Sequence, residues 1–347
     1  MSILYLMEPA LEARLKDGQI LVKKRDTSTV LKTLPLEKVE SIVALSSCYI
    51  SHRLMMHCLE KGMPMTWVNH YGRSFGRLES TQFVNVERHA LQFECYNDST
   101  FRVGLSQRIV EAKLLNTKTL LGRWRRERNL GNDDALVRES EEGIKSLALK
   151  TLEAKSIESL RGLEGNGAKL YFKALGLILK PYDGFFFDRR SKQPPLDPFN
   201  AVLSLGYTLL MYEVQNAINM KGLHAYCGVL HELRHGHPAL ASDLMEEWRA
   251  PIIDAISLAL VSQRRLNAVE GLHFQEANPE TGAVYLNHEG SSRLVEAFER
   301  KVRSVNNYST VVDYPLSYRE SIVAQIGSYC KAIEHCDYTF YQPIRIK

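Results

Sequence analysis

The sequence lacks the cysteine pattern that marks a disulfide-rich or zinc-ribbon protein. Its six cysteines are scattered through 347 residues and form no C-x-x-C pair. This argues against a disulfide framework and against a zinc site built from cysteine. We therefore expect the protein to work in a reducing cytoplasm.

Long apolar runs are also missing. A membrane-spanning helix needs about 18 consecutive apolar residues, and the nearest candidate, residues 201–212, is shorter and contains Ser204, Gly206 and Thr208. The first nine residues are apolar but lack a basic start, so we expect a first strand there and not a signal peptide. The composition, 45% hydrophobic and 24% charged, is that of an ordinary globular protein long enough for two domains.

Charge is nearly balanced overall but unevenly distributed. The formal net charge is only +4, yet residues 102–128 hold eight basic side chains against Glu111 and Glu127, a local balance of +6. A basic helix of this kind is typical of phosphate contacts. The alternative is a solvated helix face. The basic residues are Arg102, Arg108, Lys113, Lys118, Arg123, Arg125, Arg126 and Arg128.

The character of the sequence changes near residue 90. Before it, short β-type runs alternate with turn signals, and one helix is expected over residues 51–61, ended by Gly62. From Leu105 onward, apolar residues recur every three or four positions, which predicts helices. The pattern predicts an α+β protein with a small β-rich N-terminal domain and a larger all-α C-terminal domain. The expected division is residues 1–85, a linker at 86–104, a helical domain at 105–335 and a tail at 336–347.

Residues 231–235 spell His-Glu-Leu-Arg-His, which matches the H-E-x-x-H pattern of zinc proteases. That pattern needs both histidines on one face of a helix. Here Gly236 and Pro238 follow the second histidine closely, so any such helix must stop early. The positions at which the longer form of the pattern places its glycine and third histidine hold Pro238 and Ala241. A zinc protease is therefore a weak alternative.

Two further stretches each contain one residue that is a candidate catalytic or metal-binding residue. Glu164 stands beside Gly165 and Gly167 at an expected helix start, and such small residues allow a ligand or another backbone to approach closely. The alternative is a glutamate favoured by the dipole of a helix N-terminus. His231 follows an apolar run, where a histidine is more often a hydrogen-bonded core residue than a ligand.

A third stretch is rich in carboxylates. Asp243, Glu246 and Glu247 are spaced so that they can share one face of a helix. Like charges on one face repel, so a bound cation would explain the cluster, with a solvated acidic face as the alternative. Carboxylates with one histidine favour Mg²⁺ or Mn²⁺ over structural zinc.

Taken together, the order and spacing of these stretches resemble the CRISPR-associated integrase, the catalytic subunit of the spacer-acquisition complex, over nearly the whole chain. The stretches that carry the resemblance are residues 4–9, 35–43, 60–64, 76–78, the segment around Glu164, and residues 195–207, 228–231 and 243–251.

The resemblance implies a helical catalytic domain that binds Mg²⁺ or Mn²⁺ through Glu164, His231 and Glu246, which are then also the catalytic residues. Asp243 is a supporting or alternative ligand, and His231 is either a ligand or a proton acceptor. Glu232 and His235 fall outside this set. The implied reaction is attack by the 3′-hydroxyl of a captured DNA fragment on a phosphodiester of a CRISPR repeat, and the alternative is a DNA-binding scaffold without catalysis.

The resemblance also implies partners. These are double-stranded DNA with 3′ ends, a second copy of the chain, and the small ferredoxin-like second adaptation protein, with the N-terminal domain making dimer and partner contacts in a prokaryotic cytoplasm. For Asn200, which follows Asp197-Pro198, we expect a helix-capping role. The expected DNA contacts are Arg123, Arg125, Arg126, Arg189, Arg190, Lys192 and Tyr207.

Overall fold

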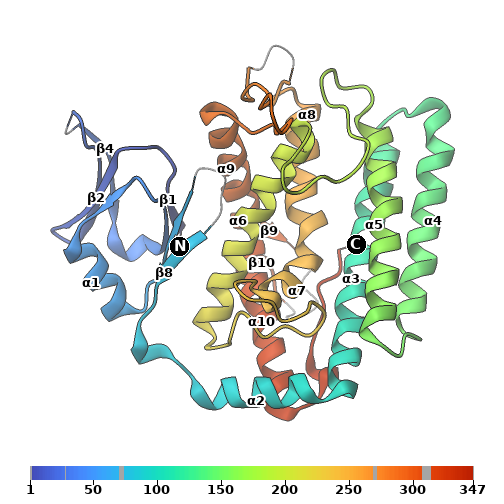
Figure 1. The fold of residues 1–347 in the computed structure, drawn as a ribbon, viewed down its shortest axis with the longest axis horizontal. Helices are drawn as coiled ribbons and strands as arrows, with labels where there is room; N and C mark the ends of the chain where they lie inside the picture. Colours follow the sequence, from blue (N-terminus) through green and yellow to red (C-terminus); the bar gives the residue numbers. More distant parts are fainter. Residues whose placement is uncertain (1, 28, 70–73, 269–271, 307–313, 347) are drawn as a thin grey trace. The chain divides into compact units, whose positions relative to one another are not determined.

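The computed structural model describes residues 2–27, 29–69, 74–268, 272–306 and 314–346. The chain forms two compact units, Met1–Asn85 and Val86–Lys347, each of which is described by itself. The two four-stranded sheets lie in the first unit, and helices dominate the second (Figure 1). The predicted α+β fold class is therefore confirmed.

The N-terminal unit contains two four-stranded sheets. In the first, the order is β1-β5-β7-β8, with β8 antiparallel to β7 and the other pairs parallel. In the second, the order is β4-β3-β2-β6. The first sheet consists of β1 (Ser2–Leu6), β5 (Val39–Leu45), β7 (Met65–Val68) and β8 (Ser74–Leu78). The second consists of β2 (Leu11–Lys16), β3 (Gln19–Lys24), β4 (Val30–Pro35) and β6 (Tyr49–Ile50).

The α-helix α1 (His52–Lys61) belongs to the N-terminal unit. It begins at Ser51, whose hydroxyl accepts the backbone N–H of Leu54. It ends at Gly62, which adopts a left-handed conformation (φ 64°) that glycine takes without steric strain. The sequence predicted this helix and its glycine end.

Residues 86–104, expected to be a linker, are helical instead. They form α2 (Val86–Asn97) and the start of α3 (Ser99–Glu127), joined at Asp98, whose carboxylate caps α3. The physical reason is that α2 is tied into the helical unit: the Gln92 side chain donates to the carbonyls of His224 and Cys227.

The C-terminal unit has two groups of helices. In Figure 1, α3 lies beside α4 (Asp134–Thr151) and α5 (Ile157–Leu179), and the three contact one another. The long helix α3 also contacts α7, which joins the two groups. The second group contains α6 (Pro198–Met220), α7 (Ala239–Trp248), the π-helix η4 (Arg249–Asp254), α8 (Ala255–Ser262), α9 (His288–Arg303) and α10 (Tyr318–His335). Shorter elements are β9 (Val305–Asn306), β10 (Leu316–Ser317), η1 (Leu36–Lys38), η2 (Thr81–Phe83), η3 (Gly131–Asp133) and η6 (Tyr338–Phe340).

The C-terminal tail is anchored against this unit. The Asn116 amide on α3 donates to the carbonyls of Ile344 in the tail and Glu247 on α7, and its oxygen accepts the N–H of Ile346. The tail therefore helps to fix α3 against α7. In the described part of the chain, no helix is long and apolar enough to cross a membrane.

Candidate active site

Glu164 lies near the middle of α5, not at a helix start. The helix begins at Ser156, whose hydroxyl accepts the N–H of Ser159, and the glutamate of its first turn is Glu158. The interpretation of Glu164 as a residue held by a helix dipole is therefore wrong. Gly167, one turn further on, packs directly against Leu114 of α3, where any Cβ would clash. This close approach of α5 to α3 brings Glu164 beside Lys113.

Lys113 lies between two carboxylates from different helices. Its Nζ donates to Oε1 of Glu164 and lies 2.6 Å from Oε2 of Glu246 on α7. Arg249 adds a second cation, with Nη2 3.0 Å from Oε1 of Glu246. Lys113 and Glu246 are both buried. The cluster thus pairs two negative charges with two positive charges, and only Glu164 and Arg249 are partly exposed to solvent.

The charges in this cluster keep Glu246 ionised. Burial by itself raises the pKa of Glu246, but the opposite charges of Arg249 and Lys113 outweigh it and lower the pKa to about 2. For Lys113, burial lowers the pKa, and the carboxylates of Glu246 and Glu164 more than reverse that effect. Both groups therefore stay charged at neutral pH.

Oε2 of Glu246 has an unusual environment. It lies 2.6 Å from Nζ of Lys113, yet among the described residues no donor is aligned to hydrogen-bond to it. The contact is therefore mainly a charge interaction, because the distance is short but the geometry is poor for a hydrogen bond. A buried carboxylate oxygen with unused lone pairs is suited to bind a cation.

His231 is held by a buried carboxylate. Oδ1 of Asp243 lies 2.6 Å from Nδ1 of His231, and the same side chain accepts the backbone N–H groups of Val229, Leu230 and His231 at 2.6, 3.0 and 3.0 Å. Burial lowers the pKa of His231, but the hydrogen bond and charge of Asp243 raise it more. With Nδ1 used in this way, Nε2 is the ring nitrogen left for a cation or a proton.

The zinc-protease interpretation fails on local structure. Residues 231–235 are not helical, and α7 begins only at Ala239. The positive φ of Gly236 (70°) and the presence of Pro238 explain why no helix passes through the motif. Glu232 is solvent-exposed and forms an ion pair with Arg161 at 2.8 Å. His231 and His235 therefore do not share a helix face.

The three carboxylates of α7 do not converge on one cation, so that prediction is wrong. Asp243 binds the loop before the helix, Glu246 faces Lys113 and Arg249, and Glu247 accepts the Tyr341 hydroxyl at 2.5 Å and the Ile344 N–H at 2.6 Å. The reason is that every residue of α7 is buried, so each side of the helix meets a different neighbour.

The donor set still suits a divalent cation. Carboxylates and imidazole are common ligands of such an ion, and a carboxylate that binds the other imidazole nitrogen orients the ring. In the described ranges, however, no three His, Cys, Asp or Glu side chains lie close enough together to hold a metal ion as they stand. Lys113 stands between Glu164 and Glu246, and its displacement is what a shared ion would require.

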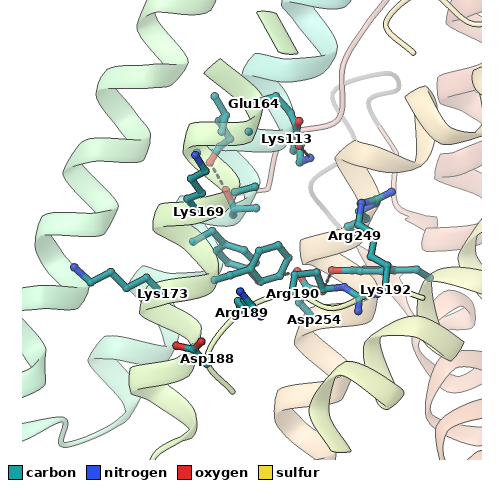
Figure 2. A pocket seen from close by; sticks show the side chains of 18 residues that line it. Lys113, Glu164, Lys169, Lys173, Asp188, Arg189, Arg190, Lys192, Arg249 and Asp254 are labelled. Carbon is teal, nitrogen blue, oxygen red and sulfur yellow. Dashed lines mark hydrogen bonds and ion pairs between the residues drawn. The ribbon is translucent and has the colours of Figure 1, made fainter. Parts of the chain in front are cut away.

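A cavity of about 440 Å³ adjoins this cluster (Figure 2). Among the described residues that line it, seven are cationic and three are acidic. A concave surface of this charge attracts phosphate groups. The cationic residues are Lys113, Lys169, Lys173, Arg189, Arg190, Lys192 and Arg249, and the acidic ones are Glu164, Asp188 and Asp254.

Asn200 positions the cavity's arginine loop. Asp197 caps α6 by accepting the N–H of Asn200 at 2.8 Å. The Asn200 side chain instead donates to the carbonyl of Arg189 and accepts a guanidinium N–H of Arg190 at 2.7 Å. The expected capping role of Asn200 is therefore wrong, because the aspartate three residues earlier fills it.

The cavity lining also contains a buried carboxylate bound by two tyrosines. The hydroxyls of Tyr207 and Tyr171 donate to Asp254 at 2.6 and 2.7 Å. Burial raises the pKa of Asp254 to about 6. The Tyr207 ring lies within 5.4 and 4.8 Å of the guanidinium carbons of Arg190 and Arg249. The hydroxyl of Tyr207, expected near DNA, is thus engaged within the protein.

The predicted arginines at the end of α3 lie elsewhere. Arg123, Arg125 and Arg126 are not among the residues that line the cavity, and Arg125 forms ion pairs with Glu141 and Asp134. Sequence reasoning missed four residues of the site. For Lys113 a signal existed in the basic stretch of α3, and Arg249 lies in the 243–251 stretch, whereas nothing in the sequence pattern singled out Tyr171 or Asp254.

Comparisons with known proteins agree on the family. The family model described as CRISPR associated protein Cas1 matches residues 4–300. A curated relative, CRISPR-associated endonuclease Cas1 3 of Thermus thermophilus, is 32% identical over 324 residues, covering 93% of this chain and 91% of the relative.

Solved structures share the fold. A Cas6-RT-Cas1–Cas2 complex matches with a TM-score of 0.81 at 22% identity, over 100% of this chain and 36% of that one. A casposase bound to integration product matches with a TM-score of 0.81 at 20% identity, over 100% and 96%. By its sequence matches, this chain belongs to the CRISPR-associated Cas1 family.

Proposed function

We propose that this protein is a divalent-metal-dependent DNA integrase, which joins the 3′ end of a captured DNA fragment to a CRISPR repeat. The observation that carries the proposal is that Glu164 from α5 and Glu246 from α7 meet at Lys113, beside a cavity whose charged residues are mainly cationic. Acidic ligands attract a divalent cation, and the surrounding lysines and arginines attract DNA phosphates.

Glu164, His231 and Glu246 would hold Mg²⁺ or Mn²⁺. When bound, the ion would lower the pKa of the attacking hydroxyl and neutralise charge on the phosphate. Asp243 is better suited to positioning than to direct ligation, because its oxygens already accept three backbone N–H groups and the His231 ring. It fixes the tautomer that leaves Nε2 of His231 available.

The proposed reaction is a transesterification. A bond forms between the fragment's 3′-oxygen and the repeat phosphorus, and the bond from that phosphorus to its former 3′-oxygen breaks. The attacking hydroxyl loses a proton, and the leaving oxygen gains one. Arg190, Lys192 and Arg249 would neutralise the charge that grows on the phosphate oxygens. The neutral Nε2 of His231, if not a ligand, would accept the proton.

We further propose that the chain acts as a homodimer with the small ferredoxin-like second adaptation protein, with residues 1–85 making dimer and partner contacts. The support is the similarity of fold to a structure named as a Cas6-RT-Cas1–Cas2 complex. Size-exclusion chromatography with light scattering, of the chain alone and mixed with that partner, measures both associations. A monomer that does not bind the partner would contradict this assignment.

Strand transfer into a supercoiled repeat plasmid with Mn²⁺ or Mg²⁺ tests the proposed activity. Glu164→Ala, His231→Ala and Glu246→Ala should each abolish joined product while leaving the protein folded. His235→Ala is the matched control, because this histidine lies outside the proposed set and should leave joining unchanged. Equal product from wild type and the three variants would support a non-catalytic DNA-binding scaffold instead.

A further inference from the structure

Lys113 occupies the position between the two carboxylates that a shared metal ion would take. Its ammonium donates to Glu164 and lies 2.6 Å from Glu246, each from a different helix. The side chain of Lys113 is 9% exposed, so water screens these contacts weakly. A lysine ammonium is a compact cation that can compensate the same negative charges as a metal ion.

A divalent ion and this ammonium cannot share the site favourably. Both would lie within a few ångströms of the same two carboxylates, where like charges in a buried setting repel strongly. Oε2 of Glu246 receives no hydrogen bond of good geometry among the described residues, so Lys113 holds it mainly by charge. A contact held mainly by charge is one that a more highly charged ion replaces readily.

The Lys113 side chain also borders a space into which its ammonium can move. Lys113 also lines the cationic cavity, together with Arg190 and Lys192. Its four-carbon stem is flexible enough to move the ammonium from the carboxylates toward that space. Figure 2 shows Lys113 and Glu164 close together in the cavity wall.

The charges favour this exchange when DNA is present. Lys113 and Arg249 balance Glu164 and Glu246, giving a net charge of zero for the four side chains. Addition of a divalent ion makes the cluster doubly positive. A DNA phosphate in the cavity would offset this excess, so each ligand should assist the binding of the other.

We propose that Lys113 is an internal counter-ion that competes with the divalent metal for Glu164 and Glu246, and that its displacement toward the DNA phosphate couples metal binding to DNA binding. This inference rests on the proposed function, because it requires those glutamates to bind the metal.

Mn²⁺ binding to the full-length protein, followed by electron paramagnetic resonance of the free ion, tests the inference without measuring activity. Lys113→Met keeps the length of the side chain and removes its charge, and without DNA it should bind Mn²⁺ at least tenfold more tightly than wild type. Lys173→Met is the matched control, because Lys173 lines the same cavity but does not pair with Glu164 or Glu246. Its affinity should stay within twofold of wild type.

Coupling is measured by repeating the titration with a short DNA duplex. The duplex should tighten Mn²⁺ binding in wild type by at least fivefold and in Lys113→Met by less than twofold. If Lys113→Met does not fold, Lys113→Gln, which keeps a hydrogen-bond donor, should show the same changes. Unchanged or weaker Mn²⁺ binding in a folded uncharged variant would overturn the inference.

Glu246→Ala separates the two proposals. If wild type binds Mn²⁺ and Glu246→Ala does not, the metal assignment stands. The Lys113 variants then test only whether Lys113 competes with the metal ion for the two glutamates. If Glu246→Ala binds Mn²⁺ as wild type does, the proposed metal site itself fails, and the inference about Lys113 fails with it.

Discussion

Asp243 binds His231 twice, at the ring and at the backbone. Its carboxylate lies 2.6 Å from Nδ1 and 3.0 Å from the N–H of the same histidine, and it also accepts the N–H groups of Val229 and Leu230. One buried side chain on α7 thus sets the path of the preceding loop and the direction of its imidazole. We infer from this arrangement that Asp243 acts by orienting His231.

Asp243→Asn should reduce strand transfer by about 10- to 100-fold, the usual effect of losing a partner of a metal ligand. It should also lower the pKa of His231, because the Asp243 charge and hydrogen bond are what raise it. Nuclear magnetic resonance titration of the imidazole measures the second effect, which a loss of stability alone would not produce. An unchanged pKa of His231 would contradict the assigned contact.

Gly228→Ala should destabilise the protein and reduce activity. A Cβ at this position would lie 2.5 Å from Oδ2 of Asp243 and 2.7 Å from the carbonyl carbon of Ala239, which is backbone and cannot turn aside. Overpacking of this kind costs about 1–3 kcal/mol. Thermal unfolding measures the loss. Gly162→Ala is the control, since nothing lies near its Cβ on α5, and it should be neutral or stabilising by up to about 1 kcal/mol.

Lys192→Met should weaken DNA binding and its dependence on salt. Lys192 lines the cavity beside Arg190 and Arg249, and each lost phosphate contact lowers the slope of log affinity against log salt by about 1. Fluorescence anisotropy with duplex DNA at several salt concentrations measures the slope. Lys331→Met, an exposed change on α10, serves as the control. The same slope in both variants would remove Lys192 from the interface.

Glu247 should make stability depend on pH. Burial raises its pKa from an ordinary 4.5 to about 8, even though Tyr341 and Ile344 donate hydrogen bonds to it. The folded state therefore holds this proton more tightly than the unfolded state. That stabilisation is fully present below pH 4.5 and is lost as the pH rises through about 8.

The Tm of wild type should therefore fall between pH 6 and pH 9 by more than that of Glu247→Gln, with a difference of roughly 5 °C. The comparison of the two proteins cancels the contributions of other titrating groups. Differential scanning calorimetry at each pH provides the measurement. Parallel pH profiles for the two proteins would show that Glu247 is ionised in the folded state throughout this range.

Local sequence signals were sufficient for much of the fold. β5 ends in four consecutive apolar residues, Ile42–Leu45, and α1 is marked by Ser51 at its start and Gly62 at its end. In β2, Leu11, Ala13 and Leu15 alternate with charged residues, which is the pattern of a half-buried strand. The sequence did not predict that residues 86–97, expected to be a linker, form α2. Contacts with a distant segment, at the carbonyls of His224 and Cys227, decide that α2 belongs to the helical unit.

The sequence by itself determined the fold class, because periodicity and capping are written along the chain. The order of its motifs determined the family, and the resemblance to that family made Glu164, His231 and Glu246 candidates. Only the tertiary structure decided how their charges are matched. Lys113 meets Glu164 across 51 positions, and Asp254 meets Tyr171 across 83. Such pairings depend on which helix faces become buried together, and burial is a property of the packed chain.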